Sequence, residues 1–260
     1  MSFIRANNLS ISFPVYTTAS RSFKNAVVSA TTGGKICSSH ADCVVVNAVD
    51  SLNLTIEEGE RVGLVGHNGS GKTTLLRVLA GAYEPTAGTL EIQGRIASFL
   101  DISLGVDQEA SGYDNILVRG ILMGLSRKEI LKKTPEIAEF TGLGDYLDMP
   151  VRTYSSGMLM RLAFAVSTAV HADIILMDEW LSVGDAEFQK RAQERLKTMV
   201  DQAAILVIAS HSPDTIESVC NRVICLEAGK IVSDEPSATT KSTHSPTPTQ
   251  HSTTANAANA

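Results

Sequence analysis

One glycine-rich segment combines residues that can bind phosphate. It follows an apolar run, precedes a stretch of helical composition, and reads Gly66-His67-Asn68-Gly69-Ser70-Gly71-Lys72-Thr73. Its glycines let the backbone turn tightly so that N–H groups converge, and a helix that starts there adds the positive end of its dipole. We therefore predict an ATP site in which Lys72 reaches the β and γ phosphates, Thr73 binds Mg²⁺ and Thr74 lies on the α-phosphate side.

Two carboxylates follow a second apolar run, Ile174–Met177. Asp178 is suited to the Mg²⁺ shell and Glu179 to polarising an attacking water, which would make the chain an ATP hydrolase. Two acids at the end of a strand can also be a solvated strand end, but the glycine-rich loop favours the catalytic interpretation. His211 follows a third apolar run and is predicted to contact the γ-phosphate, although a single imidazole, taken alone, is more often a surface histidine.

The elements that must position these residues follow an α/β pattern. The apolar runs 61–65, 174–177 and 204–209 alternate with helical segments, which is typical of a parallel sheet covered by helices. Residues 5–13 and 51–56 alternate apolar with polar side chains and predict an antiparallel β subdomain. Residues 113–140 are rich in helix formers. We therefore predict a P-loop NTPase core with an antiparallel β subdomain and an inserted α-helical subdomain.

These patterns also set the expected domain bounds. We predict one nucleotide-binding domain over residues 1–232, with its helical insert at about 103–168. Residues 17–40 are expected to form a long connection with one short helix over 20–28. After Val232 the composition changes to Ser, Thr, Pro, His, Asn and Ala, so residues 233–260 are predicted to be a disordered polar tail.

Composition narrows the classes of partner and location. The chain has 22 Lys+Arg against 28 Asp+Glu, so it lacks the basic excess that nucleic-acid binding usually requires. No uninterrupted apolar run is long enough for a bilayer, and no secretion leader is recognisable at the first residues. The four cysteines do not have zinc-site spacing and are expected to be reduced thiols. A cytoplasmic location is therefore expected.

A further motif, Tyr154-Ser155-Ser156-Gly157-Met158, precedes a helix and the Asp178–Glu179 strand. Together with the glycine-rich loop it resembles the ATP-binding subunits of ABC transporters. The commonest signature of that family is Leu-Ser-Gly-Gly-Gln, so Ser155 and Gly157 match, and Tyr154, Ser156 and Met158 depart from it. The resemblance implies a homodimer in which this trans signature, Ser155 to Gly157, contacts the γ-phosphate of the partner's ATP. From its residue type alone, Ser155 is equally a helix N-cap.

With these departures, the motif Tyr154 to Met158 resembles the ABC transporter branch that exports O-antigen, capsule and teichoic acid. The same branch is indicated by the segments 66–69, 111–116, 183–185 and 209–212. The resemblance implies a peripheral subunit at the cytoplasmic face of the inner membrane, which pairs with a separate membrane-embedded permease and drives export of a lipid-linked cell-surface polysaccharide such as O-antigen. The alternatives are an ABC exporter of a different substrate and a soluble ABC-type ATPase.

Three more roles are implied by the family resemblance. Phe13 lies where the family stacks an aromatic side chain on adenine, with Tyr16 as the nearby competitor. Asp101 is nearest to the position of a family glutamine that contacts the metal. Asp185 matches a loop that couples the two ATP sites, but an acidic residue at a helix N-terminus would look the same.

Overall fold

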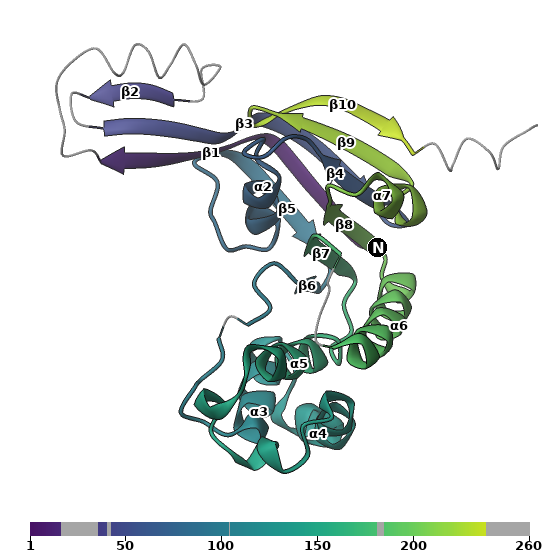
Figure 1. Cartoon of the computed structure of the whole chain (residues 1–260). Helices are drawn as coiled ribbons and strands as arrows, with labels where there is room; N and C mark the ends of the chain where they lie inside the picture. The colour runs from purple at the N-terminus through teal and green to yellow at the C-terminus, as the bar shows by residue number, and fades with distance from the viewer. Residues whose placement is uncertain (17–35, 41–42, 104, 181–184, 238–260) are drawn as a thin grey trace, which may run out of the picture.

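The computed structural model describes residues 1–16, 36–40, 43–103, 105–180 and 185–237. Figure 1 shows an upper lobe that contains the β-sheets and a lower lobe that consists of helices. The two lobes are joined at the segment after β6 (Ile96–Ser98) and at the helices α5 (Ser156–Ser167) and α6 (Ala186–Gln202). This arrangement agrees with the predicted fold class, an α/β core with a β subdomain and a helical insert.

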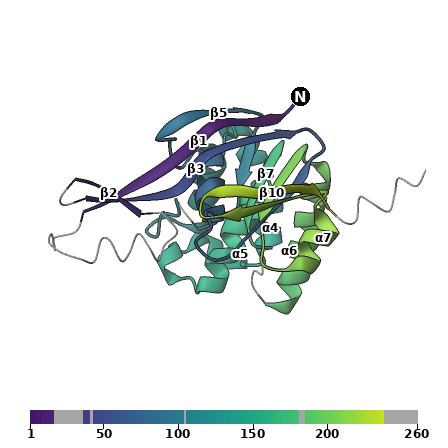
Figure 2. The same cartoon turned by 90° about the horizontal axis from the view of Figure 1, so that it is seen from above.

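The first sheet is antiparallel, in the order β2-β3-β1-β5. Its strands are β1 (Phe3–Tyr16), β2 (Ile36–His40), β3 (Cys43–Glu57) and β5 (Ala87–Gln93). Figures 1 and 2 both show β1 and β3 lying side by side. Ile4 and Ala6 face the core, and an irregularity at Asn8, whose φ is 48°, shifts the register so that Leu9 and Ile11 are buried too. The bulge therefore keeps one apolar face along a long strand.

The second sheet carries the phosphate-binding elements, in the order β10-β9-β4-β8-β7-β6. It comprises β4 (Arg61–Val65), β6 (Ile96–Ser98), β7 (Ile174–Asp178), β8 (Ile205–Ala209), β9 (Arg222–Glu227) and β10 (Lys230–Pro236). Strands β4, β6, β7, β8 and β9 pair in parallel, and β10 is antiparallel to β9. Alternate residues of β7 and β8 enter two different apolar clusters, so both faces of the sheet are covered.

Helices cover the two faces of this sheet. Helix α2 (Lys72–Leu79) contacts β3, β7 and β8, so it packs between the two sheets. On the other face, α6 (Ala186–Gln202) and α7 (Pro213–Val219) bury Leu196 and Ile216 against β7 and β8. These helices complete the layered core on which the phosphate-binding loop rests.

The helical lobe contains α3 (Gly112–Leu122), α4 (Arg127–Thr141), the 3-10 turns η1 (Gly144–Asp148) and η2 (Val151–Thr153), and α5 (Ser156–Ser167). Ser111 and Ser126 close capping boxes at the starts of α3 and α4. The lobe has its own apolar cluster, which includes Ile116, Ile130 and Leu162. Among the described residues, no helix is both long and apolar enough to cross a membrane.

Four phenylalanines join the lobes. Phe164 of α5 lies 6.4 Å from Phe99, 6.2 Å from Phe140 and 6.2 Å from Phe188, measured between ring centroids. Phe99 follows β6, Phe140 belongs to α4 and Phe188 to α6. Because aromatic pairs at these separations attract one another beyond the area that they bury, this cluster fixes α5 against the core.

Two sequence predictions are corrected by paired strands. Residues 36–40, predicted as part of a connection, form β2 and pair with the first half of β3. Residues 233–236, predicted as tail, continue β10, and Asp234 accepts bonds from Arg222 at 2.7 and 2.6 Å. Backbone ladder bonds pair these segments with β3 and β9, and the ion pair with Arg222 adds to the pairing at Asp234. The helix predicted over 20–28 and the tail from 238 onward lie outside the described residues.

We expect Phe164→Ala to lower the free energy of unfolding by about 3–5 kcal/mol, because it opens a cavity where α5 meets the core. Urea denaturation followed by circular dichroism measures the change. Tyr146→Ala is the matched control, since that ring is exposed and its removal should change stability by less than about 0.5 kcal/mol. Equal effects of the two substitutions would contradict the packing role of the cluster.

Candidate functional site

The loop between β4 and α2 has a shape that only glycine can adopt at two positions. Gly66 and Gly71 have φ values of 142° and 113°. A Cβ atom would lie 2.2 Å from the Leu226 carbonyl oxygen at Gly66, and 2.5 Å from the Ala48 carbonyl oxygen at Gly71. The loop is therefore pressed against β9 and β3, and any side chain at these positions would force the backbones apart.

Lys72 starts α2 and folds back over the loop. Its Nζ atom donates to the carbonyl oxygens of Gly66 at 2.7 Å and His67 at 3.2 Å, and only 7% of the residue is exposed. The cation thus lies at the N-terminus of α2, where the helix dipole is also positive. The combination can bind an anion with several oxygens.

A cavity of about 330 Å³, the loop pocket, opens in front of this helix. Among the described residues, Lys72 is the only lysine or arginine in its wall. Phe13 is also in the wall, and Tyr83 supports its ring edge-on with centroids 5.3 Å apart. The wall consists of Phe13, Val46, Asn47, Ala48, Asn68, Gly69, Ser70, Gly71, Lys72, Thr73, Thr74, Asp178 and His211. The loop, Asp178 and His211 therefore line one cavity.

Two oxygen-bearing side chains, those of Thr73 and Asp178, lie together in the wall of the loop pocket. Thr73 Oγ1 donates to Asp178 Oδ2 at 2.7 Å. Asp178 ends β7 beside Ala209 of β8, so the parallel pairing brings it to the loop. Magnesium is bound in proteins through one or two such oxygens together with phosphate oxygens and water. The pair fits a Mg²⁺ ion delivered with a nucleotide.

Glu179 is turned toward strand β8. Its φ is 74°, in the left-handed region that few residues other than glycine adopt, and its N–H donates to the Ala209 carbonyl at 2.8 Å. Its carboxylate accepts from Ser210 Oγ at 2.9 Å and from the His211 N–H at 3.0 Å. Glu179 is exposed and does not appear among the described residues that line the loop pocket.

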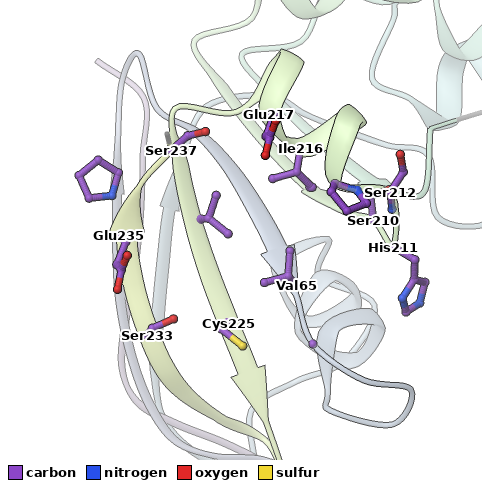
Figure 3. Close-up of a pocket in the computed structure, with 14 residues that line it drawn as sticks. Val65, Ser210, His211, Ser212, Ile216, Glu217, Cys225, Ser233, Glu235 and Ser237 are labelled. Atoms are coloured by element: carbon purple, nitrogen blue, oxygen red, sulfur yellow. The ribbon is translucent and has the colours of Figure 1, made fainter. Parts of the chain in front are cut away.

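His211 belongs to the walls of two cavities. One is the loop pocket, and the other is a groove of about 600 Å³ between α7 and the β9–β10 hairpin, called the α7 groove. Figure 3 shows the imidazole pointing away from the groove, whose floor contains Val65 and Cys225. The His211 side chain is thus available to the loop pocket, and its contact with the γ-phosphate stays a prediction.

The predicted signature residues lie apart from the loop pocket. Ser155 caps α5 by accepting a bond from the Met158 N–H at 3.2 Å, and both Ser155 and Ser156 are exposed. Gly157 is in the first turn of the same helix. Figure 1 shows α5 in the lower lobe and α2 in the upper lobe. These residues form an open helix N-terminus, which the loop pocket of the same chain does not include among its described wall residues.

The remaining family-based predictions have different outcomes. Asp101 pairs with Arg77 at 3.3 Å and is outside the described wall of the loop pocket, so its placement does not bring it to Thr73 and Asp178. Asp101 lies there because the Arg77 guanidinium, in the last turn of α2, attracts its carboxylate. Tyr16 ends β1, and its side chain lies outside the described residues.

Asp185 links the helix of the signature residues to the core. It caps α6 by accepting from the Phe188 N–H at 3.0 Å, and it forms an ion pair with Arg161 of α5. The Phe188 bond, with a smaller effect from Arg161, holds the pKa of the Asp185 carboxyl below its ordinary value. The ionised Asp185 carboxylate therefore stabilises the folded chain above the ordinary pKa of the carboxyl, and this stabilisation is lost as pH falls through the lowered pKa.

Sequence reasoning missed two contributors to the site. Ala48 of β3 contacts the loop at Gly71, and Ser210 binds Glu179. Neither of these small residues belongs to a sequence pattern that would mark it as part of a site. The position of Ser210 directly before His211 at a strand end was the available clue, since side chains at the carboxyl ends of parallel strands converge.

Comparison with known proteins identifies the family. The profile described as "ABC transporter" matches residues 49–182. The O-antigen export system ATP-binding protein RfbE of Yersinia enterocolitica is 44% identical over 224 residues, which are 86% of this chain and 94% of that protein. The chain belongs to the ABC transporter family. It is an ATP-binding subunit with the ATP-hydrolysing domain of that family.

Further relatives and solved structures agree. The O-antigen export protein RfbB of Myxococcus xanthus is 43% identical over 73% of this chain and 44% of its own length. The teichoic acids export protein TagH of Bacillus anthracis is 38% identical over 71% and 33%. A dimeric ATP-binding cassette bound to ADP and Pi superposes with a TM-score of 0.63 at 19% identity, covering 90% of this chain and 98% of that one. The ABC cassette fold is thus shown.

We expect Lys72→Ala to weaken ATP binding by about 10–100-fold, because hydrogen bonds to a charged group contribute about 1.5–3 kcal/mol. Isothermal titration calorimetry measures the dissociation constant. Lys190→Ala, which removes an exposed lysine of α6, should leave it unchanged. Unaltered ATP affinity in Lys72→Ala would contradict the assignment of the loop pocket.

Proposed function

We propose that this ABC subunit uses ATP hydrolysis to drive export of a lipid-linked cell-surface polysaccharide such as O-antigen. The observation that carries the proposal is the 44% identity to an O-antigen export protein along 94% of that protein's length. The loop pocket supplies the nucleotide site that such a motor requires. Relatives named for teichoic acid export support the same class of cargo, a surface polymer.

The residues of the loop pocket have separate roles in this proposal. Backbone N–H groups of residues 66–71 and the Lys72 ammonium bind the phosphates. The hydroxyl of Thr73 and the carboxylate of Asp178, 2.7 Å apart, would hold Mg²⁺, with Thr74 on the α-phosphate side. When bound, that ion neutralises charge that develops on the phosphates during transfer. Phe13, or Tyr16 as the competing aromatic residue of β1, would stack on adenine.

Two further residues would act on the γ-phosphate. Glu179 accepts a proton from the attacking water while the water oxygen bonds to phosphorus and the bond to the ADP oxygen breaks. The His211 imidazole, which lies in the wall of the loop pocket, contacts the γ-phosphate. The two residues are also adjacent in space, because the backbone N–H of His211 donates to the Glu179 carboxylate at 3.0 Å.

A homodimer would complete each ATP site. Ser155, Ser156 and Gly157 form an exposed helix N-terminus, which is suited to an anion but lies outside the described wall of its own loop pocket. Two chains facing each other can place each signature over the other chain's ATP. The dimeric cassette that shares this fold supports such an assembly.

The helical lobe offers a surface for the separate membrane-embedded permease. Val118, Ile121 and Leu122 of α3 are 46%, 44% and 72% exposed. Their spacing of three and four residues places them on one face of the helix. Exposed apolar residues that cluster in this way are typical of protein contacts. Docking here would hold the subunit at the cytoplasmic face of the inner membrane.

We expect Leu122→Asp to reduce copurification with the permease at least about tenfold, because the contact would then bury an unpaired charge. ATP affinity of the isolated subunit should not change. Val232→Asp places the same charge at an exposed apolar residue of β10 and is the control. If both variants copurify like the wild type, the face on α3 is not the permease contact.

We expect Glu179→Gln to bind ATP normally and to hydrolyse it at least about 100-fold more slowly, because the amide keeps the shape of the carboxylate and cannot accept the proton. The expected product is a dimer with trapped ATP, which gel filtration with MgATP detects. A monomer with wild-type turnover would contradict both the role of Glu179 and the composite site.

The same variant tests the cargo in cells. When Glu179→Gln replaces the native chain, lipid-linked polysaccharide should accumulate inside while its synthesis continues, because synthesis and export are separate steps. Separate labelling of surface and intracellular polymer measures the distribution. Undiminished surface polymer without internal accumulation would reject polysaccharide as the cargo and leave the ATPase assignment intact.

A further inference from the structure

A buried serine hydroxyl lies between the proposed base and the loop that follows β8. Ser210 is 3% exposed, and its Oγ atom lies 2.9 Å from Glu179 Oε2. The same atom lies 3.1 Å from the Ser212 N–H. Figure 3 shows Ser210 next to Ser212 at the start of α7. Ser210 is outside the described wall of the loop pocket, so it can affect the reaction only through another residue.

The two contacts fix the direction of the Ser210 hydroxyl. A serine hydroxyl has one hydrogen to donate, and its oxygen can accept bonds as well. Because the Ser212 N–H is the donor in one contact, and the ionised carboxylate can only accept in the other, the hydroxyl hydrogen points at Glu179. The His211 N–H donates to the second carboxylate oxygen at 3.0 Å. Glu179 is therefore held by two donors from consecutive residues, one on each oxygen.

The bonds that Ser210 and His211 donate to the Glu179 carboxylate, called the clamp, hold a residue whose backbone conformation is unfavourable. Glu179 has a φ of 74°, which costs a residue with a side chain on the order of 1–2 kcal/mol. The residue is also exposed, so packing alone leaves its side chain several rotamers. The bonds from Ser210 and His211, with the Glu179 N–H donating to Ala209 at 2.8 Å, select one orientation among these alternatives.

The clamp also connects Glu179 to the phosphate-binding loop. The Ser210 N–H donates to the Leu64 carbonyl at 3.4 Å, two residues before Gly66. Leu64, Ala209 and Asp178 lie in one row across β4, β8 and β7. A carboxylate tied to Ser210 thus has a set position relative to the loop that binds the γ-phosphate.

We propose that Ser210 is a positioning residue for hydrolysis, whose hydroxyl holds the Glu179 carboxylate in one orientation beside the loop pocket. This inference rests on the proposed role of Glu179 as the base. Ser210 therefore contributes to the rate of hydrolysis and not to nucleotide affinity. The orientation comes from the hydroxyl, so a side chain of similar size without the hydroxyl should not replace it.

The first test compares Ser210→Ala with Ser218→Ala in the full chain. Ser210→Ala should lower kcat for ATP hydrolysis about tenfold and leave KM within about twofold, since one of two donors to a charged group is lost. Ser218 is an exposed serine of α7 whose hydroxyl donates to the Thr215 carbonyl, and its replacement should change neither constant. Unchanged kcat in Ser210→Ala, or an increased kcat, overturns the proposal.

The second test separates positioning from a general structural effect. In a Glu179→Gln background, Ser210→Ala should cause less than a twofold further loss in single-turnover hydrolysis, because the residue acts only through the base. A further tenfold loss there overturns the proposal, since Ser210 would then act independently of Glu179. If Glu179→Gln itself turns over like the wild type, the proposed function of Glu179 fails instead, and the two failures are distinguished.

Discussion

The parallel pairing of β4, β8 and β7 is the constraint on which the site depends. It aligns Leu64, Ala209 and Asp178 in one row, so the residues that follow these strands emerge at the same edge of the sheet. The phosphate-binding loop, the carboxylates and His211 come from segments more than 30 residues apart in the chain. Because the strands are buried on both faces, a shift of their pairing would expose apolar side chains as well as separate the site.

The loop adds a second constraint, which joins the two sheets. Gly66 is packed against the Leu226 carbonyl of β9, and Gly71 against the Ala48 carbonyl of β3. Any Cβ atom at these positions would lie within about 2.5 Å of a backbone oxygen. The antiparallel sheet therefore contributes to the nucleotide site by supporting the loop as well as by carrying Phe13 in the pocket wall.

The arrangement also places the proposed nucleotide-binding groups and the proposed coupling residues in different lobes. Nucleotide-binding groups belong to the sheet lobe, whereas the signature residues and the exposed apolar face of α3 belong to the helical lobe. The phenylalanine cluster and the pair Arg161–Asp185 join the two lobes through α5 and α6. Helix α5 thus contacts both the core and α3, the helix that carries the proposed permease contact.

Local sequence alone determined the glycine-rich loop and the strands at 61–65 and 174–177, because glycine requirements and hydrophobic periodicity are local properties. It also pointed to Asp178, Glu179 and His211 as candidate site residues, since each follows an apolar run. Tertiary structure decided the rest. The bulge at Asn8, the pairing of β2 and the continuation of β10 depend on partner strands, and Asp101 is directed by Arg77. Ser210 and Glu179 are 31 residues apart, so only the folded sheet brings the hydroxyl to the carboxylate.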